Sequence, residues 1–595
     1  MADFHQYPHG LIGNCAYLAL INKDTNIDWM CLPRFDSSFV FGALIAGEKG
    51  GEFSIKPAEG EYLVRQEYRN NTNILETEVN QGSDAYKVID MAPRFMQTDR
   101  YYRPLMLVRK IEPIRGLPRV KVRCRPTGDY GKKQLDRERG SNHLRFFGLD
   151  ESLRLTTDIP LNYIIEEREF VVDRPFYLFL TYGAPLEGEI VKTAENFLSQ
   201  TTQYWQRWVK STSIGKLFQK EVIRSALTLK ICQYEDTGAI VAAPTTSLPE
   251  INGGGRNWDY RFSWMRDTFY TLNAFNHIGH FEEMEKYFSF LANIPMHEKD
   301  KIQPLYGIVG QSKLTEEILD LPGYMGNNRP VRIGNDAYTH IQNDVYGQIL
   351  LAILPLYVDR RFNNFSSASS EQLVMSVLEK IERTINDPDA GLWEFRGMAL
   401  KHTYTNLFQW AGSAAAARMA EQFEHPNLAR MAQALQKRAA SNIEKTYSAE
   451  RKAYTHAINS PHLDASTLQL ILMNYIPHDS QKARDHLKAL ESELKVGKGL
   501  FFRYIHEDDF GKPENTFMIC GFWYAEALAC VGRIDEACEA FEELCNYANH
   551  LGLFAEDIDP ETGSQWGNFP QAYSHVGLVN AAYRINNKIN EPNFL

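Results

Sequence analysis

The chain has 595 residues, more than one hydrophobic core usually organises, so we expect at least two domains. Hydrophobic residues make up 44% and charged residues 23%, as in an ordinary soluble globular protein. The net charge is −11 and no long basic run occurs, which excludes nucleic acid and an anionic membrane surface as expected partners.

The cysteine pattern and the first residues of the chain indicate in which cellular compartment the protein is expected. The eight cysteines include no CxxC pair, so a zinc knuckle is not predicted. The first residues lack the basic start and apolar run of a signal peptide, and no apolar run reaches membrane-spanning length. We therefore predict a cytoplasmic protein with free thiols and no membrane association.

Residues 1–192 are expected to form an N-terminal antiparallel β-sandwich. Their apolar pattern has mostly a period of two, and turn signals such as 80–84 and 126–129 separate the segments. Many strands without intervening helices favour a sandwich. The predicted strands are 51–57, 61–69, 72–81, 85–92, 104–111, 119–125, 142–147 and 167–182.

The residues before these strands carry polar groups around a proline-containing bend. Asp28, Trp29, Arg34 and Asp36 could reach a neighbouring site. The interpretation that we favour is a β-hairpin that caps its own sandwich.

After Lys216 the apolar pattern changes to a period of 3.6, which predicts an all-helical domain over residues 216–595. Residues 193–215 are expected to link the two domains, with a helix at 193–210 that has an apolar and aromatic face. The helices predicted after this linker are 219–234, 264–277, 281–294, 341–358, 371–386, 404–421, 426–448, 465–475, 480–494, 516–530, 533–547 and 570–585.

Consecutive helix pairs of this kind form either an open solenoid or a closed toroid of inner and outer helices. The segment 522–537 resembles a solenoid repeat locally, but a solenoid needs a fixed period, and none is found elsewhere. The connecting loops are unequal, and the longest, at about 295–340, is rich in Gly, Pro and polar residues. The toroid is therefore the predicted architecture.

The stretch 257–267 combines four aromatic and four ionisable side chains in eleven residues, directly after three glycines at 253–255. Unpaired buried charge is costly, and a solvated loop carries few aromatics, so the combination suits a pocket for a flat-faced polar ligand such as a sugar. The alternative is an edge strand of alternating aromatics whose charges pair locally. The residues alone leave both interpretations open.

Cleavage of a glycosidic bond needs one protonated and one ionised carboxyl group. Glu394 lies between Trp393 and Phe395, and an apolar setting would raise its pKa as a general acid requires, although Arg396 could oppose the shift. Its alternative role is a surface Glu paired with Arg396. Glu556 follows an apolar run, and its alternative role is an acidic loop at a helix start.

The long loop contains further candidates. Glu316 and Glu317 are rival catalytic carboxylates, although ordinary polar residues at the start of a short helix are the interpretation that we favour. Arg329 and Arg332 flank a Pro and precede a Gly-Asn turn, where they would form a clamp for hydroxyl or acid groups.

Taken together, the segments 257–267, 391–397 and 567–575 resemble glycoside hydrolase family 15, which contains glucoamylases and prokaryotic trehalases. The opening segments 13–16 and 28–29 resemble the N-terminal domain of its prokaryotic members. The resemblance implies an (α/α)6 barrel after a β-sandwich and inversion of the anomeric centre. It implies that Glu394 is the general acid, that Glu556 is the base, and that Arg266 and Asp267 hold the terminal glucose. The other residues that it implies for the sugar pocket are Trp258, Trp393, Arg329 and Tyr573.

The function expected from these residues is an exo-acting, inverting α-glucoside hydrolase of the glucoamylase type, which releases β-glucose from non-reducing ends. The alternative is a trehalase of the same family, because the aglycone pocket that would distinguish them is built from loops that the sequence does not place. A second alternative, a non-catalytic glucan-binding helical protein, is disfavoured because both Glu394 and Glu556 are retained. A carbohydrate is the expected partner, and no cofactor or metal is implied.

Overall fold

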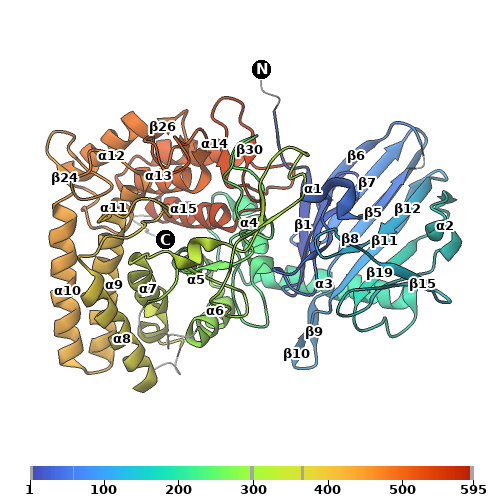
Figure 1. The fold of residues 1–595 in the computed structure, drawn as a ribbon, viewed down its shortest axis with the longest axis horizontal. Helices are drawn as coiled ribbons and strands as arrows, with labels where there is room; N and C mark the ends of the chain where they lie inside the picture. Colours follow the sequence, from blue (N-terminus) through green and yellow to red (C-terminus); the bar gives the residue numbers. More distant parts are fainter. Residues whose placement is uncertain (1–3, 58, 295–300, 363–367, 590–595) are drawn as a thin grey trace.

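A β-rich N-terminal part is followed by a helical C-terminal part, in the order that the change of apolar period predicts (Figure 1). The computed structural model describes residues 4–57, 59–294, 301–362 and 368–589. The first residues of the predicted long loop, 295–300, lie outside these ranges. In Figure 1 the two parts lie side by side, with the sheets on one side and the helices on the other.

The largest sheet of the N-terminal part has eight antiparallel strands in the order β15-β16-β17-β19-β11-β8-β7-β6. Alternating burial along β7, where Leu75, Thr77 and Val79 are buried, is the period of two that predicts these strands. The strands are β6 Leu63–Tyr68, β7 Leu75–Gln81, β8 Asp84–Met91, β11 Met106–Arg115, β15 Asp136–Arg139, β16 His143–Phe147, β17 Leu153–Thr157 and β19 Phe176–Tyr182.

One predicted strand, 167–182, is wrong as a single element. Its residues form β18 (Phe170–Val171) and β19, and the two belong to different sheets. Pro175 lies between them, and a proline has no N–H for a sheet ladder. β18 joins a second sheet in the order β18-β12-β5, with β12 at Arg119–Arg125 and β5 at Glu52–Pro57.

The opening residues form a separate four-stranded sheet between the large sheet and the helical part (Figure 1). Its strands are β1 His9–Gly13, β2 Leu18–Asn22, β3 Ile27–Cys31 and β4 Phe39–Phe41. The Trp29 indole donates a hydrogen bond to the carbonyl oxygen of Pro244 at 2.6 Å, and the Glu235 N–H donates to the Cys15 carbonyl at 2.8 Å. The hairpin that was expected to cap its own sandwich thus also contacts the helical part.

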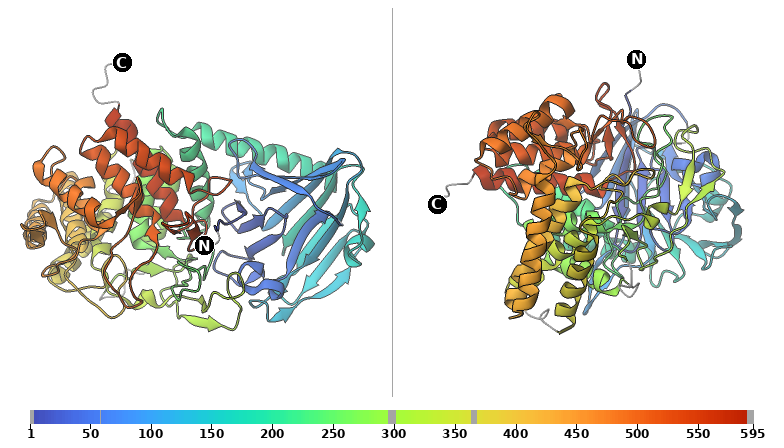
Figure 2. Two further views of the ribbon diagram at one scale, coloured as in Figure 1. Left: turned by 90° about the horizontal axis from the view of Figure 1, so that it is seen from above. Right: turned by 60° about the vertical axis from the view of Figure 1, so that its left-hand side comes forward.

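Three helices accompany the sheets: α1 Ala43–Ala46, α2 Leu161–Ile165 and α3 Ile190–Lys210. The remaining short strands of this part are β9 Phe95–Gln97, β10 Arg100–Tyr102, β13 Thr127–Gly128 and β14 Lys133–Gln134. Figure 2 shows α3 running from the sheets to the helices, where its Trp208 indole donates a hydrogen bond to Glu283 at 2.9 Å. This helix is the predicted linker helix, and it begins at Ile190 rather than at residue 193.

Twelve helices within the described residues form an inner and an outer layer. The inner helices are α5 Met265–His277, α7 Asp344–Val358, α9 Thr403–Gln422, α11 Gln469–Leu472, α13 Met518–Cys530 and α15 Ala572–Ile589. Each packs on the next in this order, and α15 packs on α5. The outer helices are α4 Gln219–Cys232, α6 Phe281–Asn293, α8 Ala368–Thr384, α10 Pro426–Glu444, α12 Gln481–Leu494 and α14 Ile534–Asn546. This arrangement confirms the predicted (α/α)6 toroid.

The two layers follow from sequence pattern. Every residue of α13 is buried, as expected for a helix that is apolar on all sides. In α14 the buried residues are Ala537, Ala540, Phe541 and Leu544, a single stripe at helical spacing, so the opposite face meets solvent. The inner helices α7 and α9 approach closely at Gly347 and Gly412, where an added Cβ on Gly412 would lie 2.4 Å from the Gly347 Cα.

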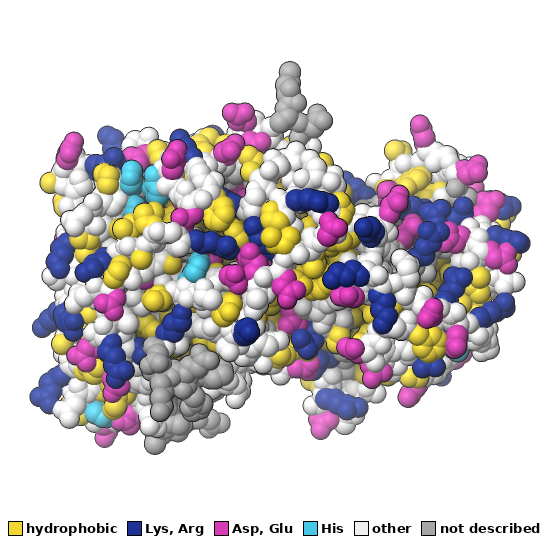
Figure 3. Space-filling model, in the orientation of Figure 1, with side chains coloured by type: hydrophobic (Ala, Val, Ile, Leu, Met, Phe, Trp, Pro, Cys, Tyr) yellow, Lys and Arg dark blue, Asp and Glu magenta, His cyan; other side chains and the backbone are white. Residues whose placement is uncertain are grey.

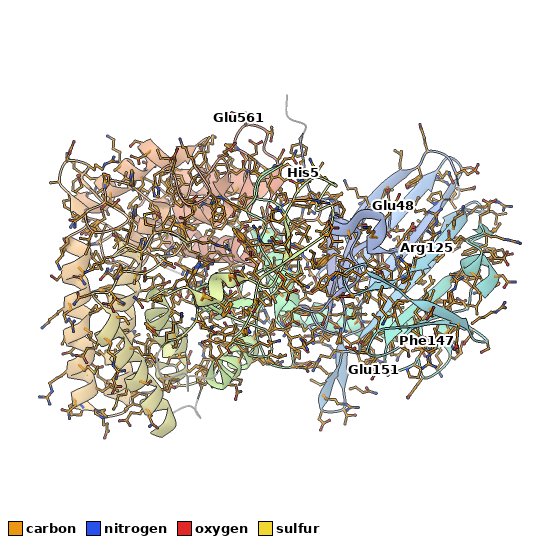
Figure 4. The ribbon with its side chains drawn as sticks, viewed as in Figure 1. His5, Glu48, Arg125, Phe147, Glu151 and Glu561 are labelled. Atoms are coloured by element: carbon orange, nitrogen blue, oxygen red, sulfur yellow. The ribbon has the colours of Figure 1, made fainter. Side chains whose placement is uncertain are left out.

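The N-terminal segment also reaches the helical part. His5, labelled in Figure 4, accepts a backbone hydrogen bond from Gln565 at 2.9 Å and has its ring stacked on Trp566 at 4.3 Å between centroids. Figure 3 shows charges of both signs mixed over the face seen there. None of the helices in the described part of the chain combines the length and apolar character that crossing a membrane requires.

Within the described residues, the loops of the helical part carry short strands and two 3-10 turns, one of which is η2 Asp336–Thr339. The strands are β20 Ser263–Trp264, β21 Leu305–Tyr306, β22 Glu317–Leu319, β23 Val331–Ile333, β24 Tyr447–Ser448, β25 Ala453–Tyr454, β26 Lys495–Val496, β27 Leu500–Phe501, β28 Thr516–Phe517, β29 Asp557–Ile558 and β30 Gln565–Trp566. The 3-10 turn η3, Ala465–Leu468, precedes α11. The predicted helix 465–475 is therefore a 3-10 turn followed by the short helix α11, which ends at Leu472.

Candidate active site

The stretch 257–267 runs extended beside residues 243–247 before it enters α5. The N–H of Ser247 donates to the carbonyl of Trp258, and the N–H of Ala243 donates to that of Tyr260. Extended backbone sends successive side chains to opposite sides. Asn257, Asp259 and Arg261 are accordingly buried, and the aromatic side chains between them face the pocket. The interpretation as a strand and the interpretation as a pocket thus each describe part of this stretch.

Arg266 and Asp267 lie in the first turn of helix α5 and line a cavity together with Tyr260. Arg266 donates to Asp267 at 3.0 Å, to the carbonyl of Leu392 at 2.9 Å and to Glu394 at 3.2 Å. Both side chains of the Arg–Asp pair keep part of their surface open, 14% and 13%. The pair is therefore fixed in place and still accessible to a ligand.

Glu394 lies at the end of a turn in the loop before α9. Its backbone is in the left-handed region, with φ of 61°, which is uncommon for a residue other than glycine and recurs at functional sites. Its carboxylate accepts hydrogen bonds from the Trp264 indole at 2.7 Å and from Arg266. The alternative pairing with Arg396 is not present, because Arg396 pairs with Glu316 at 3.3 Å.

Glu556 lies directly before β29 and is only 4% exposed. Its carboxylate accepts hydrogen bonds from the Tyr260 hydroxyl at 2.8 Å and from the Gln571 amide at 3.4 Å. Burial raises the pKa of Glu556, and the nearby Glu250 raises it further, whereas Tyr260, Arg503 and Gln571 favour the ionised form. The position of this carboxyl requires Gly567, where an added Cβ would lie 2.6 Å from the Glu556 Cβ.

The two carboxylates lie where two connected chambers meet. The outer and inner chambers share six lining residues: Tyr260, Arg266, Glu394, Phe517, Glu556 and Tyr573. The inner chamber adds Ala242, Trp264, Asp267 and Gln571. The outer chamber adds a largely charged and aromatic set that includes Glu250, Arg256, Trp258, Trp393, Arg396 and Arg503. The outer chamber also includes exposed residues, Asp509 and Phe510, so it forms the entrance and the inner chamber forms the end.

Of the other residues predicted for the sugar pocket, the structure brings three to these chambers. Trp393 donates to Asp464 at 2.8 Å, and Tyr573 packs beside Arg266, whose guanidinium carbon is 5.9 Å from the ring centroid. The Trp258 ring has two guanidinium groups over it, from Arg332 at 4.4 Å and Arg396 at 4.2 Å. Its surface is therefore already shared with charged groups.

Arg329 is not brought to the chambers. Its side chain is 60% exposed, and its ion-pair partner is Asp320 at 3.8 Å. Arg332 occupies the inward position instead, where it pairs with Glu316 at 3.0 Å. The predicted clamp therefore has only one of its two arginines near the pocket.

The rival carboxylates of the long loop do not line the chambers. Glu316 is held between Arg332 and Arg396, and Glu317 is exposed in strand β22. The expected short helix at these residues is wrong, because the segment pairs with β23 as a strand. The site also includes Tyr260, Gln571, Glu250 and Arg503, whose roles the sequence motifs do not indicate. Tyr260 could have been found from its place in the aromatic stretch.

The two carboxyl groups at the junction of the chambers are the kind of pair that cleavage of a glycosidic bond needs. Residues 217–583 match the sequence profile described as Glycosyl hydrolases family 15, and residues 7–168 match the one described as Trehalase-like, N-terminal. The first match spans more than half of the chain. The chain therefore belongs to glycosyl hydrolases family 15, as the resemblance of its motifs implies.

Relatives of similar length agree with this assignment. The chain is 32% identical to the trehalase of Thermoplasma volcanium, over 97% of this chain and 93% of that protein. It is 30% identical to the trehalase of Mycolicibacterium smegmatis, over 97% of this chain and 90% of that protein. The structure of a bacterial glucoamylase complexed with acarbose covers 98% of this chain and 95% of its own, with a TM-score of 0.69 and 15% identity. At that identity the likeness shows the fold alone.

Proposed function

We propose that this glycoside hydrolase is a trehalase, which cleaves α,α-trehalose into two glucose molecules. The observation that carries the proposal is similarity to proteins named trehalase along nearly the whole chain, at 30–32% identity. The glucoamylase likeness supports the fold but not the substrate, because its identity is 15%. Trehalase activity, the alternative drawn from the sequence, is thus better supported than glucoamylase activity, which was the main prediction.

The two chambers would each bind one glucose of the substrate. The inner chamber would hold the glucose whose anomeric carbon reacts, with Arg266 and Asp267 bonded to its hydroxyls. The scissile bond would then lie at the junction, between Glu394 and Glu556. The outer chamber would hold the second glucose, which leaves.

In this proposal the reaction is a single inverting displacement. Glu394 protonates the glycosidic oxygen as the bond to the anomeric carbon breaks, and Glu556 takes a proton from the attacking water. Burial makes Glu556 a stronger base than an exposed glutamate, since the pKa of its carboxyl is raised. Hydrogen bonds from Tyr260 and Gln571 stabilise the ionised form that the water requires.

The test is a substrate panel with NMR detection of the released anomers. Trehalose, maltose, isomaltose and maltooligosaccharides are compared, and we expect trehalose to be preferred. Inversion of trehalose gives equal initial amounts of α- and β-glucose, whereas retention would give the α-anomer alone. Preference for maltooligosaccharides would instead support the glucoamylase prediction.

Matched variants test the two carboxylates. Glu394→Gln and Glu556→Gln should each lower turnover by about 100- to 10,000-fold while circular dichroism remains unchanged. Glu317→Gln, in a carboxylate outside the chambers, is the control and should retain wild-type turnover. Normal turnover in either chamber variant would contradict the assignment, and hydrolysis of no substrate by the wild type would favour the glucan-binding alternative. A cytoplasmic location remains a prediction from the sequence.

A further inference from the structure

The outer chamber has the composition of a site for a complete sugar. Both charged groups and aromatic rings line it, including Glu250, Arg256, Trp258, Trp393, Arg396 and Asp508. A sugar presents hydroxyl groups at its edge and C–H groups on its faces, so it suits such a wall. A leaving group without hydroxyls could not form hydrogen bonds with the polar groups of this wall.

Arg396 lies in this wall beside the proposed general acid. It follows Glu394 by two residues on the same loop, and both line the outer chamber. The proton from Glu394 goes to the oxygen that joins the two sugars, so the leaving sugar must lie next to this loop. Arg503, another arginine of the chamber, is 8% exposed and pairs with Glu250, whose charge raises the pKa of Glu556, the proposed base.

The surroundings hold Arg396 in one place. The Asp509 carboxylate accepts hydrogen bonds from the backbone N–H groups of Arg396 at 2.6 Å and Gly397 at 3.0 Å. The Glu316 carboxylate bridges Arg396 at 3.3 Å and Arg332 at 3.0 Å. Arg332 in turn donates to the carbonyls of Gly255 and Asn257, each at 3.0 Å. Four loop segments thus fix one guanidinium over Trp258.

The Arg396 guanidinium still has N–H groups that could donate hydrogen bonds to a ligand. Among the described residues its side chain makes one hydrogen bond, to Glu316, although a guanidinium has five N–H donors. Arg256 is engaged more fully, since it donates to Asp508 at 2.6 Å and to the carbonyl of Gly511 at 3.1 Å. Arg396 is also partly exposed at the chamber, with 32% of its side chain accessible.

We infer that Arg396 determines specificity for the leaving glucose, because its preorganised guanidinium donates hydrogen bonds to hydroxyls of that sugar. The inference rests on the proposed trehalase function and adds the residue that distinguishes a sugar from other leaving groups. Glu316 is a positioning residue that acts through Arg396. Removing a charged donor to a bound hydroxyl typically lowers binding of the transition state by about 10- to 100-fold.

Two substrates that differ only in the leaving group test this role. Trehalose and α-D-glucosyl fluoride place the same glucose in the inner chamber, but fluoride has no hydroxyls for the outer chamber. In both reactions water adds to the anomeric carbon and loses its proton to Glu556. We expect Arg396→Ala to lower kcat/KM for trehalose by roughly 10- to 100-fold and to change kcat/KM for the fluoride by less than about threefold.

Further variants separate recognition from folding. Arg396→Lys keeps the charge but not the planar donors, so its loss on trehalose should be intermediate. Glu316→Gln weakens the ion pair that positions Arg396 and should give a smaller loss confined to trehalose. The control is Arg174→Ala, which removes an arginine paired with Asp158 at 2.6 Å and lying 4.2 Å from the Phe176 ring, far from the chambers in the N-terminal part.

The outcomes are distinct. Equal losses on both substrates, or no loss on trehalose, would overturn the role of Arg396. If Arg396→Ala fails to fold, the ratio of the two kcat/KM values in Arg396→Lys and Glu316→Gln decides the question in the same way. A wild-type enzyme that hydrolyses the fluoride but not trehalose would overturn the proposed function instead.

Discussion

The stretch 257–267 contains two Arg–Asp pairs that have opposite surroundings. Asp259 and Arg261 are joined at 2.7 Å with 0% and 1% of their side chains exposed, whereas Arg266 and Asp267 are joined at 3.0 Å and open to the pocket. Arg261 also donates to the carbonyl of Ser37 at 2.8 Å and to the Tyr130 hydroxyl at 3.2 Å. The first pair therefore joins the two parts of the molecule, and the second faces the inner chamber.

The difference arises from backbone geometry and not from residue type. Asp259 and Arg261 are two residues apart on extended backbone, so their side chains lie on the same side and bond to each other. Arg266 and Asp267 are adjacent in the first turn of α5, at the end of the pocket. The same two residue types thus hold the protein together in one place and are available to bind a sugar, as proposed, in the other.

The largest effect is expected from Asp259→Asn. This change leaves the buried Arg261 guanidinium without its charged partner, and the loss of one member of a buried ion pair typically costs about 3–5 kcal/mol. The thermal unfolding midpoint, followed by circular dichroism, should fall clearly. Turnover per folded molecule should change far less, because neither side chain of the pair lines the chambers.

The matched change Asp267→Asn should have the reverse pattern. It removes the carboxylate proposed to hold the reacting glucose, and misplacement of a substrate can cost about 100-fold in rate. The midpoint should fall less than in Asp259→Asn, because the side chains of this pair are partly hydrated. Similar losses of stability in both variants, or wild-type kcat/KM in Asp267→Asn, would remove the distinction between the pairs.

The smallest effect is expected from Tyr260→Phe, between the two pairs. The Tyr260 hydroxyl bond lowers the pKa of Glu556, so its loss should raise that pKa further. A general base acts in its ionised form, so the proposed activity of Glu556 falls as pH falls through its pKa. The acid limb of the kcat/KM profile should therefore move to higher pH. An unchanged limb would show that Glu556 does not govern it.

Much of the fold could be predicted from periodicity, because apolar spacing records which face of an element is buried. Helix α4 occupies Gln219–Cys232 within the predicted 219–234. The ends of helices were predicted less well where a neighbouring strand determines them. The predicted helix 516–530 begins only at Met518, because Thr516–Phe517 forms strand β28. Such pairing depends on residues of β29, about 40 positions away.

The sequence predicted which residues line the chambers better than it predicted the contacts between them. Glu394, Glu556, Arg266 and Asp267 line the chambers, where their roles remain proposals. Arg329 does not, and the sequence could not distinguish it from Arg332, because both flank the same Pro-Val pair and the tertiary pairing of β23 decides which one points inward. Contacts between distant loops, such as Arg396 over Trp258, leave no local pattern.

The contacts of Arg261 and Trp29 make the helical toroid dependent on the sheets. In a shortened chain that starts at α4, the Arg261 guanidinium would lose the Ser37 and Tyr130 oxygens, and the Pro244 carbonyl would lose the Trp29 indole. Both groups lie within or next to the strand that carries Tyr260 to Glu556. The N-terminal part therefore supports one wall of the proposed active site, and a toroid produced without it should lose that support.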